Sequence, residues 1–241
     1  MKRIVFPFLG MLMLVTSGCI KKGDNIGAFT DEPAIVRFNY DFFLPTLVTR
    51  WGAFVAPELQ SKFFTEINEG DLLWTHFEVN YDQQSSTEYL VVSSLLYGKI
   101  DQEGWPSATP GGESVTGDFN VPIEGMIPYT RIENYLFFLF GHMAPTGQKF
   151  TYEMTYDPEP ADTKVLYLRA KKTGEESTKT KELFPVPFAF YMGSFFSEYK
   201  GADNKVNVSF RFKIEDDEAG NEQYYLYMDQ YGRSIFSFEV E

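Results

Sequence analysis

The chain has few of the residues that build disulfides, metal cages and most catalytic centres. Its 241 residues include one cysteine, Cys19, and two histidines, His76 and His142. A single cysteine excludes an intramolecular disulfide and a cysteine-based zinc cage within one chain. Two histidines leave little material for a His-rich metal site. We therefore expect no cofactor.

Basic residues are also scarce. The chain has 34 acidic and 21 basic residues, a net charge of -13, and without Lys2 and Arg3 the count is 34 against 19, or -15. A surface of this sign repels phosphate backbones, so we expect no nucleic-acid partner. The charge is explained most simply by solubility, and a cationic partner or a calcium site is the alternative.

The amino terminus has an apolar run that is too short to cross a bilayer. Residues 4–15 are almost wholly apolar and follow two basic residues, whereas a spanning helix needs about 20 residues. This length is typical of a secretory leader. Small residues at 16–18 directly precede Cys19 and resemble the lipobox of bacterial lipoproteins, in which the cysteine carries a diacylglycerol. We therefore predict a signal peptide at residues 1–18, lipidation of Cys19 and a membrane anchor without a span.

Beyond the leader, a polar tether is predicted at residues 19–32, and period-two alternation of apolar and polar residues then dominates. Such alternation is typical of antiparallel strands with one buried and one solvent-facing side. The clearest runs are residues 35–43, 76–82, 150–157, 206–215 and 236–240. Weaker runs are residues 88–96, 135–140, 164–169, 188–192 and 224–228. Helical spacing is confined to a few residues after Pro57, so the sequence predicts an all-β protein with one short helix.

A long segment without alternation divides the strands into two groups. Residues 101–118, DQEGWPSATPGGESVTGD, are rich in glycine and proline. Because a structureless loop of this length is uncommon inside one compact domain, we interpret it as an inter-domain loop. The strands before it, at residues 33–100, suffice for a small barrel. Those after it, at residues 119–241, suffice for an antiparallel β-sandwich.

Several segments resemble a known family in order and spacing. In the first half these are DEPAIVRFNYDFF and NEGDLLWTHFEVNYD, and in the second IENYLFFLFGH, GQKFTYEMTYDPE and KVLYLRAKKTGEES. Together with Cys19 they are similar to the NigD-like lipoproteins of Bacteroidetes, which have an N-terminal OB-like barrel domain and a C-terminal β-sandwich. The resemblance implies an outer-membrane lipoprotein, on the cell surface or the periplasmic face. It transfers no catalytic residue, and the family is named for its association with a bacteriocin locus.

Two features are candidate binding sites. Trp105 lies in the long loop, where an aromatic ring can stack on a sugar or anchor the loop to the domain. Asp216, Asp217 and Glu218 offer hard oxygen ligands for a metal such as calcium, and a solvated hairpin explains the same residues. Trp51 and Trp74 are interpreted as core residues, and His76 is placed on a solvent-facing side.

No sequence motif indicates an enzyme. The chain has no G-x-S-x-G elbow, no H-E-x-x-H pair and no glycine-rich phosphate loop, and nothing selects two of its 34 acids as a glycosidase pair. We therefore interpret it as a non-enzymatic, lipid-anchored binding module for a glycan or an envelope protein. The alternative is a structural or bacteriocin-immunity-type envelope lipoprotein with no small ligand, and a hydrolase on a β scaffold is the least favoured reading.

Overall fold

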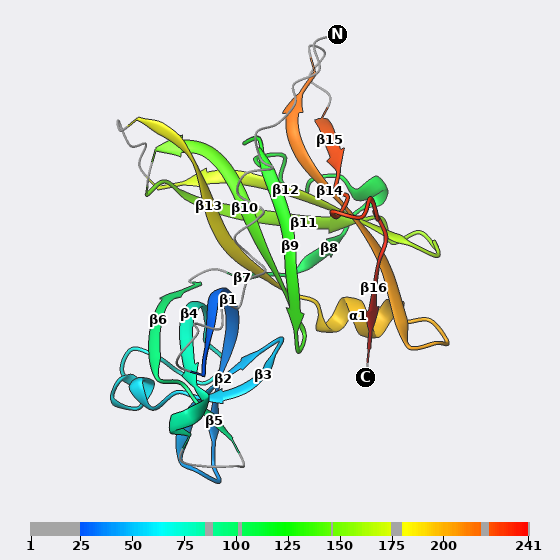
Figure 1. Cartoon of the computed structure of the whole chain (residues 1–241). Coiled ribbons are helices and arrows are strands. Elements are labelled where there is room, and N and C mark those ends of the chain that lie inside the picture. Colours follow the sequence, from blue (N-terminus) through cyan, green and yellow to red (C-terminus); the bar gives the residue numbers. More distant parts are fainter. Residues whose placement is uncertain are drawn as a thin grey trace. The chain divides into compact units, whose positions relative to one another are not determined.

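The computed structural model describes residues 25–84, 89–100, 103–145, 147–174, 180–217 and 222–240 (Figure 1). The chain divides into two compact units, Met1–Asp101 and Gln102–Glu241. Each unit has its own sheets and its own hydrophobic core. The all-β class predicted from the alternating pattern is confirmed. None of the helices in the described ranges is both long and apolar enough to cross a membrane.

The first unit contains a six-stranded sheet in the order β5-β3-β2-β1-β4-β6. Its strands are β1 (Ile26–Asn39), β2 (Leu44–Thr49), β3 (Gly52–Val55), β4 (Leu72–Asn80), β5 (Leu90–Val91) and β6 (Ser94–Lys99). All neighbours are antiparallel except β3 and β5. Among the described residues β5 and β6 do not pair with each other, so the sheet of the OB-like domain expected here is open and not a closed barrel. The predicted short helix is a 3₁₀ turn, η3 (Pro57–Lys62).

Strand β1 begins earlier than the pattern predicted. Residues 26–32, expected in the tether, pair with β4 from Ile26↔Asn80 to Glu32↔Thr75. The register shifts between Phe29 and Glu32, and such a bulge places an extra residue in one strand. Because the bulge interrupts the alternation of inward and outward side chains, the period-two pattern becomes readable only beyond it.

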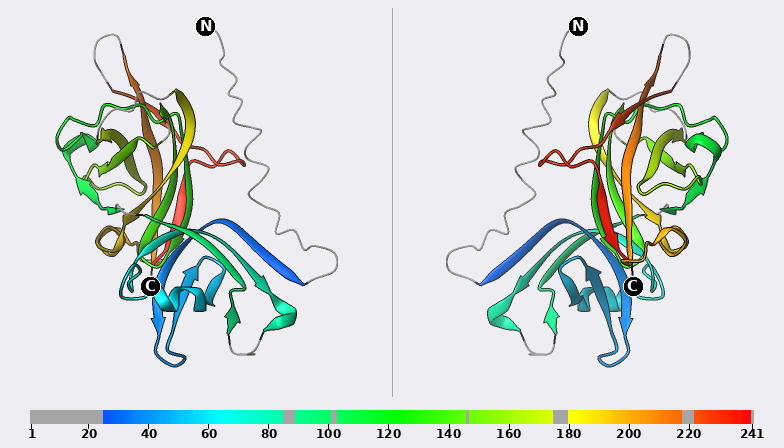
Figure 2. Two further views of the ribbon diagram at one scale, coloured as in Figure 1. Left: turned by 90° about the vertical axis from the view of Figure 1, so that its left-hand side faces the viewer. Right: turned by 90° about the vertical axis from the view of Figure 1, so that its right-hand side faces the viewer.

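The second unit is a sandwich of two sheets, ordered β7-β13-β10-β9 and β15-β14-β12-β11-β8, and β16 also pairs with β14. The first sheet contains β7 (Glu103–Gly104), β9 (Gly125–Ile132), β10 (Tyr135–Pro145) and β13 (Lys181–Tyr191). The second contains β8 (Pro106–Ala108), β11 (Lys149–Tyr156), β12 (Lys164–Thr173), β14 (Lys205–Asp216), β15 (Glu222–Leu226) and β16 (Phe236–Glu239). The side views of Figure 2 show the connection between β15 and β16, in orange-red, projecting from this unit.

The sandwich contains parallel as well as antiparallel strand pairs, whereas the sequence predicted an antiparallel sandwich. The pairs β7–β13, β8–β11 and β12–β14 are parallel. Between β12 and β14 the chain passes through β13 in the other sheet and through the short helix α1 (Gly193–Tyr199). A crossover of this length allows the chain to return in the same direction.

Aromatic side chains from both sheets fill the core of the sandwich. Phe138 packs edge-to-face on Phe210 with ring centroids 5.5 Å apart, and Phe140 stacks on Tyr152 at 4.1 Å. These contacts join β10 to strands of the facing sheet, and such pairs contribute beyond their buried area. The alternating apolar residues of the second half are therefore the inner faces of two packed layers.

The segment expected as an inter-domain loop belongs largely to the second unit. From residue 103 onward it forms β7 and β8, which pair with β13 and β11, and then a 3₁₀ turn, η5 (Pro110–Gly112). Strands of two or three residues are too short to show alternation. The sequence pattern therefore missed them.

Candidate functional site

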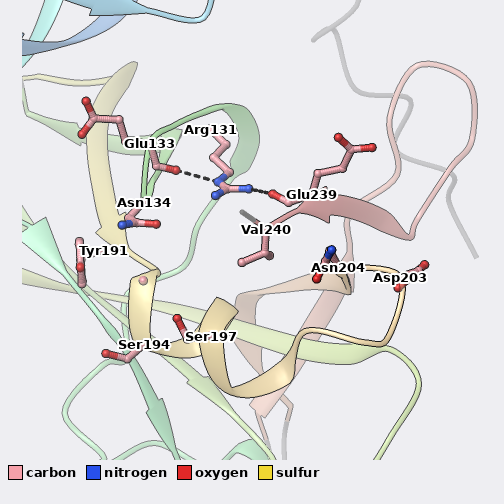
Figure 3. Close-up of a pocket in the computed structure, with 11 residues that line it drawn as sticks. Arg131, Glu133, Asn134, Tyr191, Ser194, Ser197, Asp203, Asn204, Glu239 and Val240 are labelled. Atoms are coloured by element: carbon pink, nitrogen blue, oxygen red, sulfur yellow. Dashed lines mark hydrogen bonds between the residues drawn. The ribbon is translucent and has the colours of Figure 1, made fainter.

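An open depression of about 1370 Å³ lies in the second unit where the β9–β10 turn, the end of β13, helix α1, the turn before β14 and the end of β16 meet (Figure 3). Its lining residues are Arg131, Glu133, Asn134, Tyr191, Gly193, Ser194, Ser197, Asp203, Asn204, Glu239 and Val240. Most of them carry hydroxyl, amide or carboxylate groups. These residues come from five stretches of the chain, none of which has a motif of its own.

The only cation in that lining, Arg131, is held by the protein itself. Its Nε donates to the carbonyl of Glu133 at 2.7 Å, and its Nη1 donates to the carbonyl of Glu239. Its guanidinium also lies over the ring of Phe196, with Cζ 4.6 Å from the centroid. Figure 3 shows this side chain bridging the β9–β10 turn and the end of β16. Arg131 therefore shapes the depression, and its charge is largely satisfied.

Three side chains of the lining carry hydroxyl groups, those of Tyr191, Ser194 and Ser197. The serine hydroxyl groups, on Ser194 and Ser197, have no histidine beside them in the lining. The histidine of this unit, His142, is buried and hydrogen-bonded elsewhere. A serine nucleophile needs a base within hydrogen-bond reach. The groups that the lining offers to a ligand are hydrogen-bond donors and acceptors.

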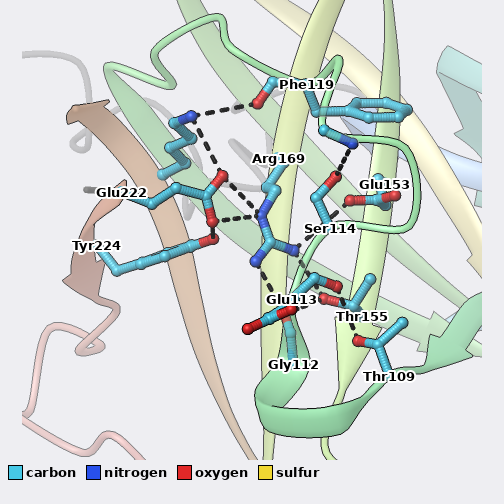
Figure 4. A network of polar contacts seen from close by, with 12 residues as sticks. Thr109, Gly112, Glu113, Ser114, Phe119, Glu153, Thr155, Arg169, Glu222 and Tyr224 are labelled. Carbon is cyan, nitrogen blue, oxygen red and sulfur yellow. Dashed lines mark hydrogen bonds and ion pairs between the residues drawn. The ribbon is translucent and has the colours of Figure 1, made fainter. Parts of the chain in front are cut away.

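A second polar feature, the Arg169 network, lies on the outer face of the second sheet under residues 109–119 (Figure 4). Its members are Glu153, Thr155, Arg169, Lys213, Glu222 and Tyr224. Alternation predicts Glu153, Thr155 and Lys213 on the solvent side of their strands. These three residues are nevertheless buried, and Arg169 is about 1% exposed, because the loop covers them.

Arg169 connects the covering loop to the sheet. Its Nη2 donates to the Gly112 carbonyl at 2.8 Å, and its Nη1 donates to Thr155 Oγ1 at 2.7 Å. Its Nε lies 3.1 Å from Glu222 Oε2, and Glu153, its cross-strand partner, lies 3.6 Å away. Glu153 in turn accepts from the Val115 amide at 2.9 Å. These contacts indicate a structural clamp for the loop.

The charges of the network favour an ionised Glu222. Burial by itself would raise the pKa of this carboxyl group, but the hydrogen bond from Tyr224 and the charge of Arg169 hold the pKa below its usual value. Lys213 adds an ammonium 3.2 Å from Glu222 Oε1. Charge-assisted hydrogen bonds of this kind are stronger than neutral ones. Glu222 is thus a fixed anion between two cations.

His142 is part of the core of the sandwich. Its ring stacks on Phe150 at 4.0 Å, Nδ1 lies 3.1 Å from the Pro122 carbonyl, and Nε2 lies 2.9 Å from the Tyr152 hydroxyl. A carbonyl can only accept, so Nδ1 carries the proton and Nε2 accepts from Tyr152. Burial lowers the pKa of His142 to about 4. The histidine is therefore neutral and satisfied at neutral pH.

In the first unit, both tryptophans bind carboxylates beside the β1 bulge. Trp51 Nε1 donates to Glu32 at 3.0 Å, and Trp74 Nε1 donates to Asp31 at 3.2 Å. Trp51 is 60% exposed, so its assignment to the core was wrong. It lies in the β2–β3 hairpin turn, and turn residues tend to stay at the surface. His76 is exposed as predicted and faces Asp31.

The residues selected from sequence are not brought together. Trp105 is 67% exposed, lies between β7 and β8, and is not part of the depression lining. The Asp216 carboxylate lies 2.9 Å from the Lys213 ammonium, and Glu218 and Cys19 lie outside the described residues. Within the described ranges no three His, Cys, Asp or Glu side chains could hold a metal ion.

The fold is shared with solved structures from species of Parabacteroides and Bacteroides. An uncharacterized protein from Parabacteroides merdae is 17% identical, with a TM-score of 0.67 over 87% of this chain and 98% of its own. A candidate lipoprotein from Bacteroides fragilis is 14% identical, with a TM-score of 0.53 over 83% and 96%. A NigD-like immunity protein from Bacteroides caccae is 14% identical, with a TM-score of 0.52 over 87% and 97%.

Searches by sequence give no corresponding match. No family model matches the chain, and no curated protein matches it. The structural likeness therefore shows a fold that this chain shares with a NigD-like immunity protein and with a candidate lipoprotein. The resemblance predicted from sequence is confirmed at the level of fold.

Proposed function

We propose that this chain is a non-enzymatic lipoprotein of the bacterial envelope, of the NigD-like immunity type. The observation that carries the proposal is the fold shared with a NigD-like immunity protein over 87% of this chain and 97% of that protein. The candidate lipoprotein with the same fold and the lipobox-like leader before Cys19 add support.

The placement of the histidines supports a role without catalysis. His142 is locked between Pro122 and Tyr152, and His76 faces Asp31 on the surface of the other unit. Neither histidine has a serine or cysteine hydrogen-bonded to it in the described chain. A general base must reach the proton that it removes.

Lipidation is tested first, because it places the protein at a membrane. With radioactive palmitate in the growth medium, the wild-type protein is expected to be labelled and to fractionate with membranes. The Cys19→Ser variant should be unlabelled and released, since the thiol is the acylation site and acyl chains contribute about 0.8 kcal/mol per buried CH₂. An unmodified Cys19 in the membrane fraction, shown by mass spectrometry, contradicts this prediction.

Immunity is tested by sensitivity to secreted antagonists. A strain that lacks the gene is challenged with culture supernatants of related toxin-producing strains. It is expected to become sensitive to at least one of them, and expression of the full chain should restore resistance. The Cys19→Ser variant is the matched control for the anchor and should restore it poorly. Unchanged sensitivity across the panel would count against the immunity role and would leave the lipid anchor standing.

A further inference from the structure

We propose that the polar depression of the second unit binds an uncharged saccharide of more than one ring. The inference does not depend on the immunity role, and it rests on the lining shown in Figure 3. Trp105, the tryptophan singled out from sequence, takes no part in it, because it does not line the depression.

The lining offers polar groups that have no partner within the described part of the chain. The side chains of Asn134, Tyr191, Ser194, Ser197 and Asn204 line the depression, are accessible to solvent and make no hydrogen bond to another described residue. Amide and hydroxyl groups can each both donate and accept. Sugar hydroxyls also do both, so these five side chains match the chemistry of a polyhydroxylated ligand.

Two residues of the lining have an unusual backbone conformation. Asn204 and the lining residue Glu133 have left-handed backbone, with φ of 57° and 51°. They are two of the five non-glycine residues with positive φ in the described chain. Such conformations are unfavourable outside glycine, least so for asparagine, and they cluster at binding sites. The turns that carry Asn134 and Asn204 are therefore preset in shape.

An aromatic ring is fixed at the edge of the depression. Tyr191 is 39% exposed and packs edge-to-face on Tyr135, with centroids 5.3 Å apart. A Cβ at position 193 would lie 2.6 Å from its hydroxyl oxygen, so Gly193 allows this placement of the ring. A held, partly exposed ring can stack against the C–H face of a sugar at little entropic cost.

The charge of the lining disfavours anions. Arg131 is engaged by backbone carbonyls and the Phe196 ring, and the Glu239 carboxylate lies 3.9 Å from the Lys205 ammonium. The lining also carries the Asp203 carboxylate, which accepts from a backbone amide and has no cationic partner among the lining residues. A phosphate or an acidic sugar would meet repulsion there. The volume of about 1370 Å³ exceeds the roughly 300–1,000 Å³ of common small-molecule pockets. An extended ligand therefore fits better than a single ring.

The test uses the full chain, purified in detergent, on an array of neutral, acidic and basic oligosaccharides. Soluble maltotriose, cellotriose, mannotriose and triacetylchitotriose are then titrated by calorimetry. We expect at least one neutral probe to bind. Tyr191→Leu and Asn134→Leu should each weaken that binding about tenfold, since one good contact is of that order. Tyr225→Leu and Asn207→Leu, exposed positions of the same unit outside the lining, should bind like wild type.

Melting temperatures are measured for all four variants, and Asn134→Leu decides the test if Tyr191→Leu fails to fold. Side-chain amide resonances of Asn134 and Asn204 should shift with the bound probe. The proposal is overturned if no neutral probe binds, if acidic or basic sugars bind in preference, or if the variants in the lining and the controls lose binding equally.

Discussion

Replacing Arg169 with methionine is expected to lower the free energy of unfolding of the second unit by about 3–5 kcal/mol. The substitution leaves Glu153 buried without its cation, and it removes the donors to Thr155 and to the Gly112 carbonyl. Removal of one member of a buried ionic network exposes the full desolvation cost of the remaining charge. Urea unfolding followed by Trp105 fluorescence measures the effect, in a background with Trp51→Phe and Trp74→Phe. In that background Trp105 is the remaining tryptophan.

A matched control comes from an exposed arginine of the same sheet. Arg211→Met, on β14, should change the free energy of unfolding by less than about 0.5 kcal/mol, as surface substitutions usually do. Adding Glu153→Gln to Arg169→Met should recover part of the loss, because the unpaired charge is then gone. Faster hydrogen exchange of the Val115 amide, which is bound to Glu153, would show that the covering loop is released. A loss below about 1 kcal/mol would contradict the clamp.

Acidification is expected to destabilise the protein through His142. The unfolded histidine takes up a proton near pH 6.5, whereas burial lowers the pKa of the folded one to about 4. Between these values the unfolded state binds more protons, so stability is complete above about pH 6.5 and is lost as the pH falls towards 4. The interval corresponds to about 3 kcal/mol. Urea unfolding measured at several pH values between about 4.5 and 7 gives the slope.

The variant His142→Phe isolates this contribution. Phenylalanine can stack on Phe150 but cannot titrate, so the difference in stability between wild type and variant should shrink steadily below about pH 6.5. Burial raises the pKa of the nearby Glu124, so this carboxyl group increases stability as the pH falls, opposite to His142. Glu124 is present in both proteins, and the comparison therefore reports on His142. Equal pH profiles for wild type and His142→Phe would refute the assignment.

The strands could be predicted from the sequence wherever one side of the strand faces the core and the other faces solvent. β11 and β14 appear within a residue or two of the alternating runs at 150–157 and 206–215, because buried apolar side chains impose period two on a half-buried strand. The pattern failed where this condition does not hold. β7 and β8 are too short for it, and the bulge in β1 interrupts it.

The candidate sites were much less predictable. Asn134, Tyr191 and Asn204 are far apart in sequence, and each is an ordinary polar residue in a turn or at a strand end. Their common property, an unpaired polar group facing one depression, exists only after folding. A weak signal was available for Asn204, since asparagine tolerates left-handed backbone, but such a signal marks a turn and not a ligand.

By itself, the order of residues determined the all-β class and the two groups of strands, and it predicts an acidic surface and a lipid anchor, because each depends on local pattern or on composition. Only the tertiary structure decided that Arg169 is buried, that Trp51 is exposed and that two turns, two strand ends and a short helix border one polar depression. The alternating pattern predicts which side of a strand a residue occupies. Whether a loop covers that side depends on contacts between distant segments, and such contacts produce no periodic pattern in the sequence.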